Sequence, residues 1–245
     1  MAKKFLLLSV VVVFTALTAS AAPPPNAPVT WGSPTNISGD TDVSLDGSLV
    51  AAFNMVGGNV SVNGVTFAAF PVTGGSTSAT NGNFSFSESP GILVTWTTLG
   101  SASAPFSNLS ANYQTLLSTA ISTDANNTLT LVMSGLVTGQ QYEFEWWLNA
   151  ASNSSNGFLT TATATNSVSL DDNTTDANGG VGQHVTGTFT AIAGNETITF
   201  NGTLTGQAPT INAFQLRAVP EPSTMSILLI GAILVSGARF LCRKN

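Results

Sequence analysis

Hydrophobic and polar residues alternate in short stretches along most of the chain between residues 31 and 218. Successive side chains of a strand point to opposite faces, so this period of two predicts half-buried strands. Val62 and Val65 flank Asn63-Gly64, a dipeptide typical of a two-residue hairpin turn. Further strands are predicted at residues 49–53, 84–86, 92–96, 129–133, 141–149, 158–165, 184–191, 196–201 and 211–217.

The hydrophobic period changes once, where it indicates a helix that starts near Ser107 or Asn108. The apolar face of this helix is formed by Leu109, Tyr113, Leu116, Leu117, Ala120 and Ile121. Many strands at fairly regular spacing and one short helix predict an all-β fold, a β-sandwich of jelly-roll type. The polar stretches at 73–83, 152–157 and 171–180 are interpreted as loops, so residues 31–218 form one β-sandwich domain.

The N-terminal residues are typical of a secretory signal. Lys3 and Lys4 precede an apolar run at residues 5–17, and Ala19 and Ala21 are the small residues that signal peptidase requires. Residues 1–21 are therefore predicted to be a signal peptide. Residues 22–30 form a Pro-rich leader, and the protein is predicted to be exported.

The C-terminal residues predict a membrane segment over 225–241. Its apolar run begins at Met225, and a transmembrane helix of this length is marginal unless Arg239 extends its side chain toward the lipid headgroups. Arg239, Arg243 and Lys244 form a basic end that should stay cytoplasmic, which leaves the body outside.

The motif that precedes this segment carries a family resemblance, and its residues are Val219, Pro220, Glu221, Pro222, Ser223 and Thr224. Together with the apolar run and the basic end, residues 219–245 resemble a PEP-CTERM sorting signal. The resemblance implies that an exosortase-type transpeptidase recognises the tail and cuts near Pro220-Glu221-Pro222. Such proteins are found in Gram-negative bacteria that form biofilms rich in exopolysaccharide.

The body resembles, more loosely, jelly-roll modules of secreted PEP-CTERM proteins. The matching segments lie at 40–43, 62–67, 136–142, 187–190 and 212–217. This resemblance implies a fold similar to carbohydrate-binding sandwiches more strongly than it implies an activity.

Charge narrows the classes of partner. Of six Lys and Arg, only Arg217 lies in the body, against eleven of the twelve acidic residues. So acidic a body cannot neutralise phosphates, which excludes nucleic acid as a partner. The single cysteine, Cys242, lies in the tail, so no disulfide can form within the chain.

One predicted strand, residues 141–149, is a candidate glycan site. Its first face should be core, with Tyr142, Phe144, Trp146 and Leu148. The second face carries Glu143, Glu145, Trp147 and Asn149, which combine an indole with polar groups as sugar platforms do. The alternative is that Trp147 packs beneath a loop or an edge strand.

Asp40, Asp42 and Asp46 are weak candidates for a calcium site. Oxygen side chains alternate from residue 40 to 46, but the glycine and the final acid of an EF-hand are missing. Only a calcium site of another type is left as a hypothesis, and no other cofactor is predicted.

No catalytic constellation is apparent in the sequence. His184 is the one histidine and is interpreted as a surface or edge residue, and no nucleophile elbow is present. Glu143 and Glu145 could be a glycosidase pair, although neighbouring acids on one strand cannot easily flank a substrate bond. The sequence therefore predicts a non-catalytic protein of the cell surface or extracellular matrix. Contact with exopolysaccharide, a purely structural role and, least favoured, a glycan-active enzyme stay open as hypotheses.

Overall fold

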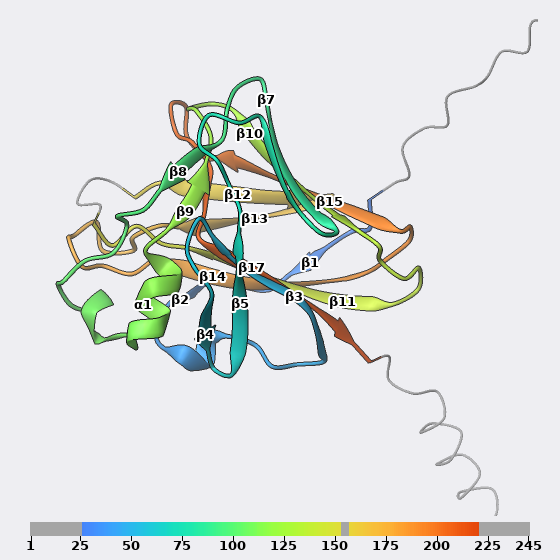
Figure 1. Ribbon diagram of the computed structural model, residues 1–245, viewed down its shortest axis with the longest axis horizontal. Coiled ribbons are helices and arrows are strands. Elements are labelled where there is room, and N and C mark those ends of the chain that lie inside the picture. Colours follow the sequence, from blue (N-terminus) through green and yellow to red (C-terminus); the bar gives the residue numbers. More distant parts are fainter. Residues whose placement is uncertain (1–25, 153–156, 221–245) are drawn as a thin grey trace, which may run out of the picture.

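The computed structural model describes residues 26–152 and 157–220, which fold into an all-β sandwich (Figure 1). The larger sheet has eight strands. In spatial order they are β1 (Thr30–Trp31), β14 (Gln183–Thr190), β11 (Gln141–Leu148), β17 (Ala213–Val219), β3 (Ser48–Met55), β5 (Val65–Phe70) and β4 (Val60–Val62), and β2 (Thr35–Asn36) also pairs with β14.

A six-stranded sheet packs against it. Its strands, again in spatial order, are β13 (Asn166–Asp171), β12 (Leu159–Ala164), β15 (Asn195–Gly202), β10 (Thr128–Ser134), β7 (Phe84–Ser89) and β6 (Ser78–Asn81). A third, small sheet contains β16 (Thr210–Ile211), β9 (Ala120–Ser122) and β8 (Val94–Trp96). β3 and β5 run parallel, and the other paired strands of the described residues are antiparallel.

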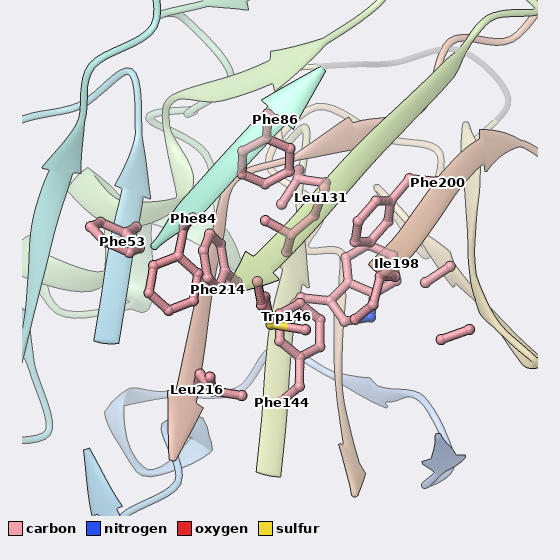
Figure 2. Close-up of a cluster of buried hydrophobic side chains, with 14 of the residues drawn as sticks. Phe53, Phe84, Phe86, Leu131, Phe144, Trp146, Ile198, Phe200, Phe214 and Leu216 are labelled. Carbon is pink, nitrogen blue, oxygen red and sulfur yellow. The ribbon is translucent and has the colours of Figure 1, made fainter. Parts of the chain in front are cut away.

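The main core lies between the two large sheets and follows the predicted alternation. In β10, Leu129, Leu131 and Met133 are buried and the residues between them face outward. Figure 2 shows the aromatic centre of this cluster, where Phe214 of β17 and Phe86 of β7 meet with their ring centroids 5.8 Å apart. Burial of these rings supplies much of the energy that holds the sheets together.

A third layer covers the outer face of β11. It consists of the hairpin β4–β5, which is the end of the larger sheet and packs back over β11, with the 3₁₀ helix η1 (Asp40–Asp42) and α1 (Ala111–Leu117), which lies beside β4 (Figure 1). A second buried cluster fills the space beneath this layer and joins Phe67, Tyr113 and Leu116 to Trp147. A second 3₁₀ helix, η2 (Phe106–Asn108), precedes α1.

The hairpin turn is confirmed, whereas the predicted helix is too long. Asn63 and Gly64 both have positive φ, as a two-residue hairpin turn of this kind requires. α1 begins only after Ser110, whose hydroxyl accepts a hydrogen bond from the Tyr113 amide, and it ends at Leu117. Ala120 and Ile121 belong to β9, because pairing with β8 and β16 overrides the helical spacing of their side chains.

Candidate functional site

The predicted glycan platform on β11 is wrong, because both faces of this strand are buried. Glu143, Glu145, Trp147 and Asn149 are at most 7% exposed, and Trp147 is fully buried. The loop that contains residues 43–47, together with α1 and β5, covers this face. Thus the alternative, that Trp147 packs beneath neighbouring elements, describes the structure.

Trp147 is held by contacts on several sides. Its indole Nε1 donates a hydrogen bond of 2.9 Å to the Tyr113 hydroxyl, and its ring meets Phe67 edge-on at 5.5 Å. The imidazole of His184 stacks on it at 6.2 Å, so His184 is a partly buried neighbour of this cluster. Burial, and then the negative charge of Asp42, raises the pKa of Tyr113 well above its ordinary value.

The two glutamates serve different structural roles. Glu145 accepts hydrogen bonds from the Ser44 amide at 3.1 Å and from Gln215 Nε2 at 2.6 Å, and its Oε1 lies 3.1 Å from His184 Nδ1. Glu143 Oε1 has no hydrogen-bond partner within the described part of the chain. Burial therefore raises the pKa of Glu143, although the Ser44 hydroxyl partly offsets the shift.

Arg217, the one cation of the body, binds the same loop. Its guanidinium donates to the carbonyl oxygens of Leu45, Asp46 and Gly47 and is itself buried. Asn149 is also a packing residue, since its side-chain oxygen accepts from the Gly182 amide and its Nδ2 donates to the Leu117 carbonyl. Neither residue is available to a ligand.

The three aspartates proposed for calcium do not converge. Asp42 accepts hydrogen bonds from the amides of Ser38 and Gly39 and from the Tyr113 hydroxyl, and Asp40 accepts one from the Ser110 hydroxyl. Asp46 lies in the loop that Arg217 binds. No group of three or more His, Cys, Asp or Glu residues that could hold a metal ion exists in the described ranges.

A pocket of about 340 Å³ opens at one end of the sandwich, where β11 ends and β12 begins. It is lined by Trp96, Leu99, Ser122, Ala150, Ser152, Phe158, Asp172, Ala208 and Thr210. Trp96 and Phe158 expose 46% and 40% of their surface, so two aromatic rings at this pocket are open to solvent. An apolar pocket with a few polar groups is the usual form of a small-ligand site.

The polar groups of the pocket are fixed by the backbone around them. Asp172 Oδ1 accepts a hydrogen bond of 2.9 Å from the Phe158 amide, which ties the loop after β13 to the start of β12. The Thr210 hydroxyl lies 3.3 Å from the Ser122 hydroxyl, which donates in turn to the Pro209 carbonyl at 2.8 Å. Asp172 and Ser122 are themselves buried, so the polar side chains that the pocket presents to solvent are those of Ser152 and Thr210.

Sequence reasoning missed this site. It placed Trp96 and Phe158 in two separate predicted strands, and no motif or spacing links residues so far apart along the chain. The small sheet of β8, β9 and β16 brings the two regions together, because the Thr210 amide of β16 donates a hydrogen bond of 3.0 Å to the Thr160 hydroxyl of β12. The one signal in the sequence is that Trp96 stands between two polar residues, Thr95 and Thr97.

The residues predicted to direct sorting lie largely outside the described residues. This holds for Ala19, Ala21, Glu221, Pro222, Ser223, Thr224, Arg239, Arg243 and Lys244, and for the membrane segment 225–241. Val219 ends β17, and its carbonyl accepts a hydrogen bond of 2.6 Å from Gln140 Nε2. Within residues 26–152 and 157–220, no helix has the length and apolar character needed to cross a membrane.

Comparison with known proteins yields similarity of fold only. No protein-family model matches the chain, and no curated protein matches it either. Among solved structures, it is similar to the ANX1 ectodomain from Arabidopsis thaliana, with 12% identity and a TM-score of 0.48 over 71% of this chain and 49% of that one. A Bacteroides uniformis beta-glucuronidase 2, with 15% identity and a TM-score of 0.45, matches over 69% of this chain and 18% of its own. The chain thus spans less than half the length of these structures, and the likeness concerns the course of the strands alone.

Proposed function

We propose that this chain is an exported, non-catalytic surface or matrix protein whose sandwich binds glycan in the pocket between Trp96 and Phe158. The observation that carries the proposal is the pair of half-exposed rings in a pocket that also presents the side chains of Ser152 and Thr210. Aromatic faces contact the C–H groups of sugars, while protein hydroxyls bind sugar hydroxyls. The proposed glycan contact is therefore at the end of β11 and not on the buried face of this strand.

The strand order supports a jelly roll as the finer description of the sandwich. The run β14–β11–β17–β3 in one sheet faces the run β13–β12–β15–β10 in the other. From β10 to β15 each strand crosses to the opposite sheet, except that β12 and β13 form a hairpin within the six-stranded sheet, and this is the order of a jelly roll.

Charge favours a neutral glycan over an acidic one. Arg217 is the only Lys or Arg in the body, and its guanidinium is buried against loop carbonyls. A pocket without a cation cannot offset the repulsion between this acidic domain and a polyuronate. We therefore expect binding to neutral polysaccharides, with little effect of salt.

The proposal is tested by native affinity electrophoresis of residues 22–220 in gels that contain neutral or acidic polysaccharides. Trp96→Ala and Phe158→Ala should each weaken retention about tenfold, which corresponds to about 1.4 kcal/mol. The matched control is Val137→Ala, which removes an exposed side chain far from the pocket and should leave retention unchanged. No retention of the wild-type protein on any polysaccharide would favour the purely structural alternative, and release of sugar from the panel would favour an enzyme.

The route of export is the second part of the proposal. β17 ends at Val219, so Pro220-Glu221-Pro222 directly follows the folded body, where an extracytoplasmic exosortase-type enzyme could reach it. Signal peptidase would remove residues 1–21, and the membrane segment would hold the precursor until the tail is cut. Mass spectrometry of the protein from a host with an exosortase should find a C-terminus near this motif, and a full-length C-terminus there would contradict it.

A further inference from the structure

Large hydrophobic side chains that are exposed gather at the two ends of the sandwich. Within the described residues, four of them lie at or near the pocket end, namely Ile92, Trp96, Phe158 and Leu204. Five others lie at the opposite end, near the point where the chain leaves the folded body. These are Leu45, Leu49, Val50, Val137 and Ile192, which we call the exit rim.

One side of the exit rim lies against the last residues of β17. Leu49 pairs directly with Arg217, and Ser48 pairs with Ala218. The Leu45 carbonyl accepts a hydrogen bond from Arg217 Nη2, so the loop that carries Leu45 is fixed to the same strand. The bulge between Leu216 and Arg217 leaves Val50 without a partner on β17, and its side chain is exposed.

The other side of the exit rim is fixed through Gln140. This side chain donates to the Val219 carbonyl, while its amide donates to the Val137 carbonyl at 3.0 Å. The amide of Ala191 donates to the Gln140 carbonyl, which places Ile192 next to the same loop. Hydrophobic side chains 44–64% exposed therefore flank the exit of the chain on both sides.

The apolar run of the tail follows closely. Only residues 221–224 separate Pro220 from Met225, so an extended chain places these two residues at most about 18 Å apart. Whatever surface the apolar run enters must therefore lie beside the exit rim. Isolated apolar side chains on a surface are ordinary, but a group of them around one point indicates an interaction site.

We infer that the exit rim contacts the outer surface of the lipid bilayer in the tail-anchored precursor, and that the domain stands on the membrane with its pocket facing away. This inference rests on the proposed membrane segment 225–241. β11 runs from the exit end to the pocket end, and its eight residues span about 26 Å. The pocket is thus held clear of the headgroups and open to polysaccharide outside the cell.

The contact must be apolar, because the described residues of the body carry no exposed cation and many acids. Anionic lipids would repel such a domain, so the bilayer contact should be strongest on zwitterionic lipid. The same charge argues against a peripheral protein that binds without its tail. The tail anchors the domain to the membrane, and the exit rim sets the orientation of the domain on it.

The test uses the chain from residue 22 to 245 in phosphatidylcholine vesicles that contain a headgroup-quencher lipid. Cys242→Ser removes the native thiol, and a fluorophore is placed either at Ser48→Cys beside the exit rim or at Thr205→Cys beside the pocket end, both exposed. We expect the label at position 48 to lose most of its fluorescence and the label at position 205 to lose almost none. A triple variant should restore the fluorescence at position 48 while the protein still floats with the vesicles. It combines Leu45→Ser, Leu49→Ser and Val137→Ser.

The outcomes separate this inference from the proposed anchor. Failure to float would refute the membrane segment and the inference with it. Flotation with equal fluorescence at both positions, or quenching that persists in the triple variant, would leave the anchor intact and overturn the contact of the exit rim. Disulfide crosslinking of the unlabelled Ser48→Cys variant to a second copy, without lipid quenching of the labelled protein, would show that a second copy of the chain covers the exit rim instead, which also overturns it. Circular dichroism checks that the triple variant remains folded.

Discussion

The two faces of β11 are equally buried but are built from different chemistry. The face toward the six-stranded sheet carries Phe144 and Trp146, which pack into an aromatic core. The opposite face carries Glu143, Glu145 and Trp147 beneath a layer of loop, hairpin and helix. Alternation of apolar and polar residues thus distinguishes the two environments of this strand, although neither of them is solvent.

The comparison teaches that a polar strand face can be a hydrogen-bonded interior. Burial of a carboxylate costs free energy unless it is paired, and Glu145 has three partners. The apolar face needs no such pairing and leaves only Trp146 Nε1 without a partner in the described chain. The hydrogen bonds of the polar face fix the position of the covering loop. The apolar face contributes hydrophobic stabilisation.

Truncation of either tryptophan should have the largest effect. Trp147→Ala and Trp146→Ala each empty a fully buried ring site, so each should lower the free energy of unfolding by about 3–5 kcal/mol. Urea denaturation followed by circular dichroism measures both. If Trp147→Ala were as stable as the wild type while Trp146→Ala was not, the two faces would differ in burial and the comparison would fail.

The sequence predicted the architecture better than the site because these depend on different information. Hydrophobic alternation in segments such as residues 129–133 depends only on which side of a strand meets the core, and the structure bears it out. The layer that covers the polar face of β11 is formed by residues 40–70 and 111–117, which are distant from β11 in the sequence. Nothing in the local pattern around Trp147 records that cover.

The pocket could not be predicted from the sequence for the same reason. Trp96 and Phe158 meet at one end of the sandwich through strand connections that have no local signature. Ile121 shows the converse, because its helical spacing was real and strand pairing overrode it. The local hydrophobic period predicts helices and strands. Contacts between distant segments decide where these elements end, which strand faces are covered and where pockets form.

Loss of the buried carboxylate at position 145 should have the next largest effect. Glu145→Ala leaves the Ser44 amide, Gln215 and His184 facing a site without an acceptor, which should cost about 2–3 kcal/mol. Asp124→Ala is the matched control, since Asp124 is exposed and should change stability by less than about 0.5 kcal/mol. Thermal unfolding of the two variants side by side measures the difference, and equal melting temperatures would mean that the loop does not depend on Glu145.

Neutralising Glu143 should have the smallest effect and the opposite sign. Its folded-state pKa is raised from the ordinary value of 4.5 chiefly by burial, so the folded state holds this proton more tightly than the unfolded chain does. Glu143 therefore makes the wild type less stable as pH rises from 4.5 through the raised pKa. Glu143→Gln removes a buried charge whose Oε1 is unpaired and should raise the free energy of unfolding at pH 7 by about 1 kcal/mol.

The advantage of Glu143→Gln should disappear below pH 4.5, where Glu143 is protonated in both the folded and the unfolded wild-type protein. Urea denaturation of the variant and the wild type across pH 3.5–8 follows this difference. Asp124→Ala again serves as the control for the loss of an exposed carboxylate. A variant that is less stable than the wild type at pH 7 would show that charged Glu143 is well paired. The polar face would then resemble the apolar face, because its burial would carry little cost in unpaired polar groups.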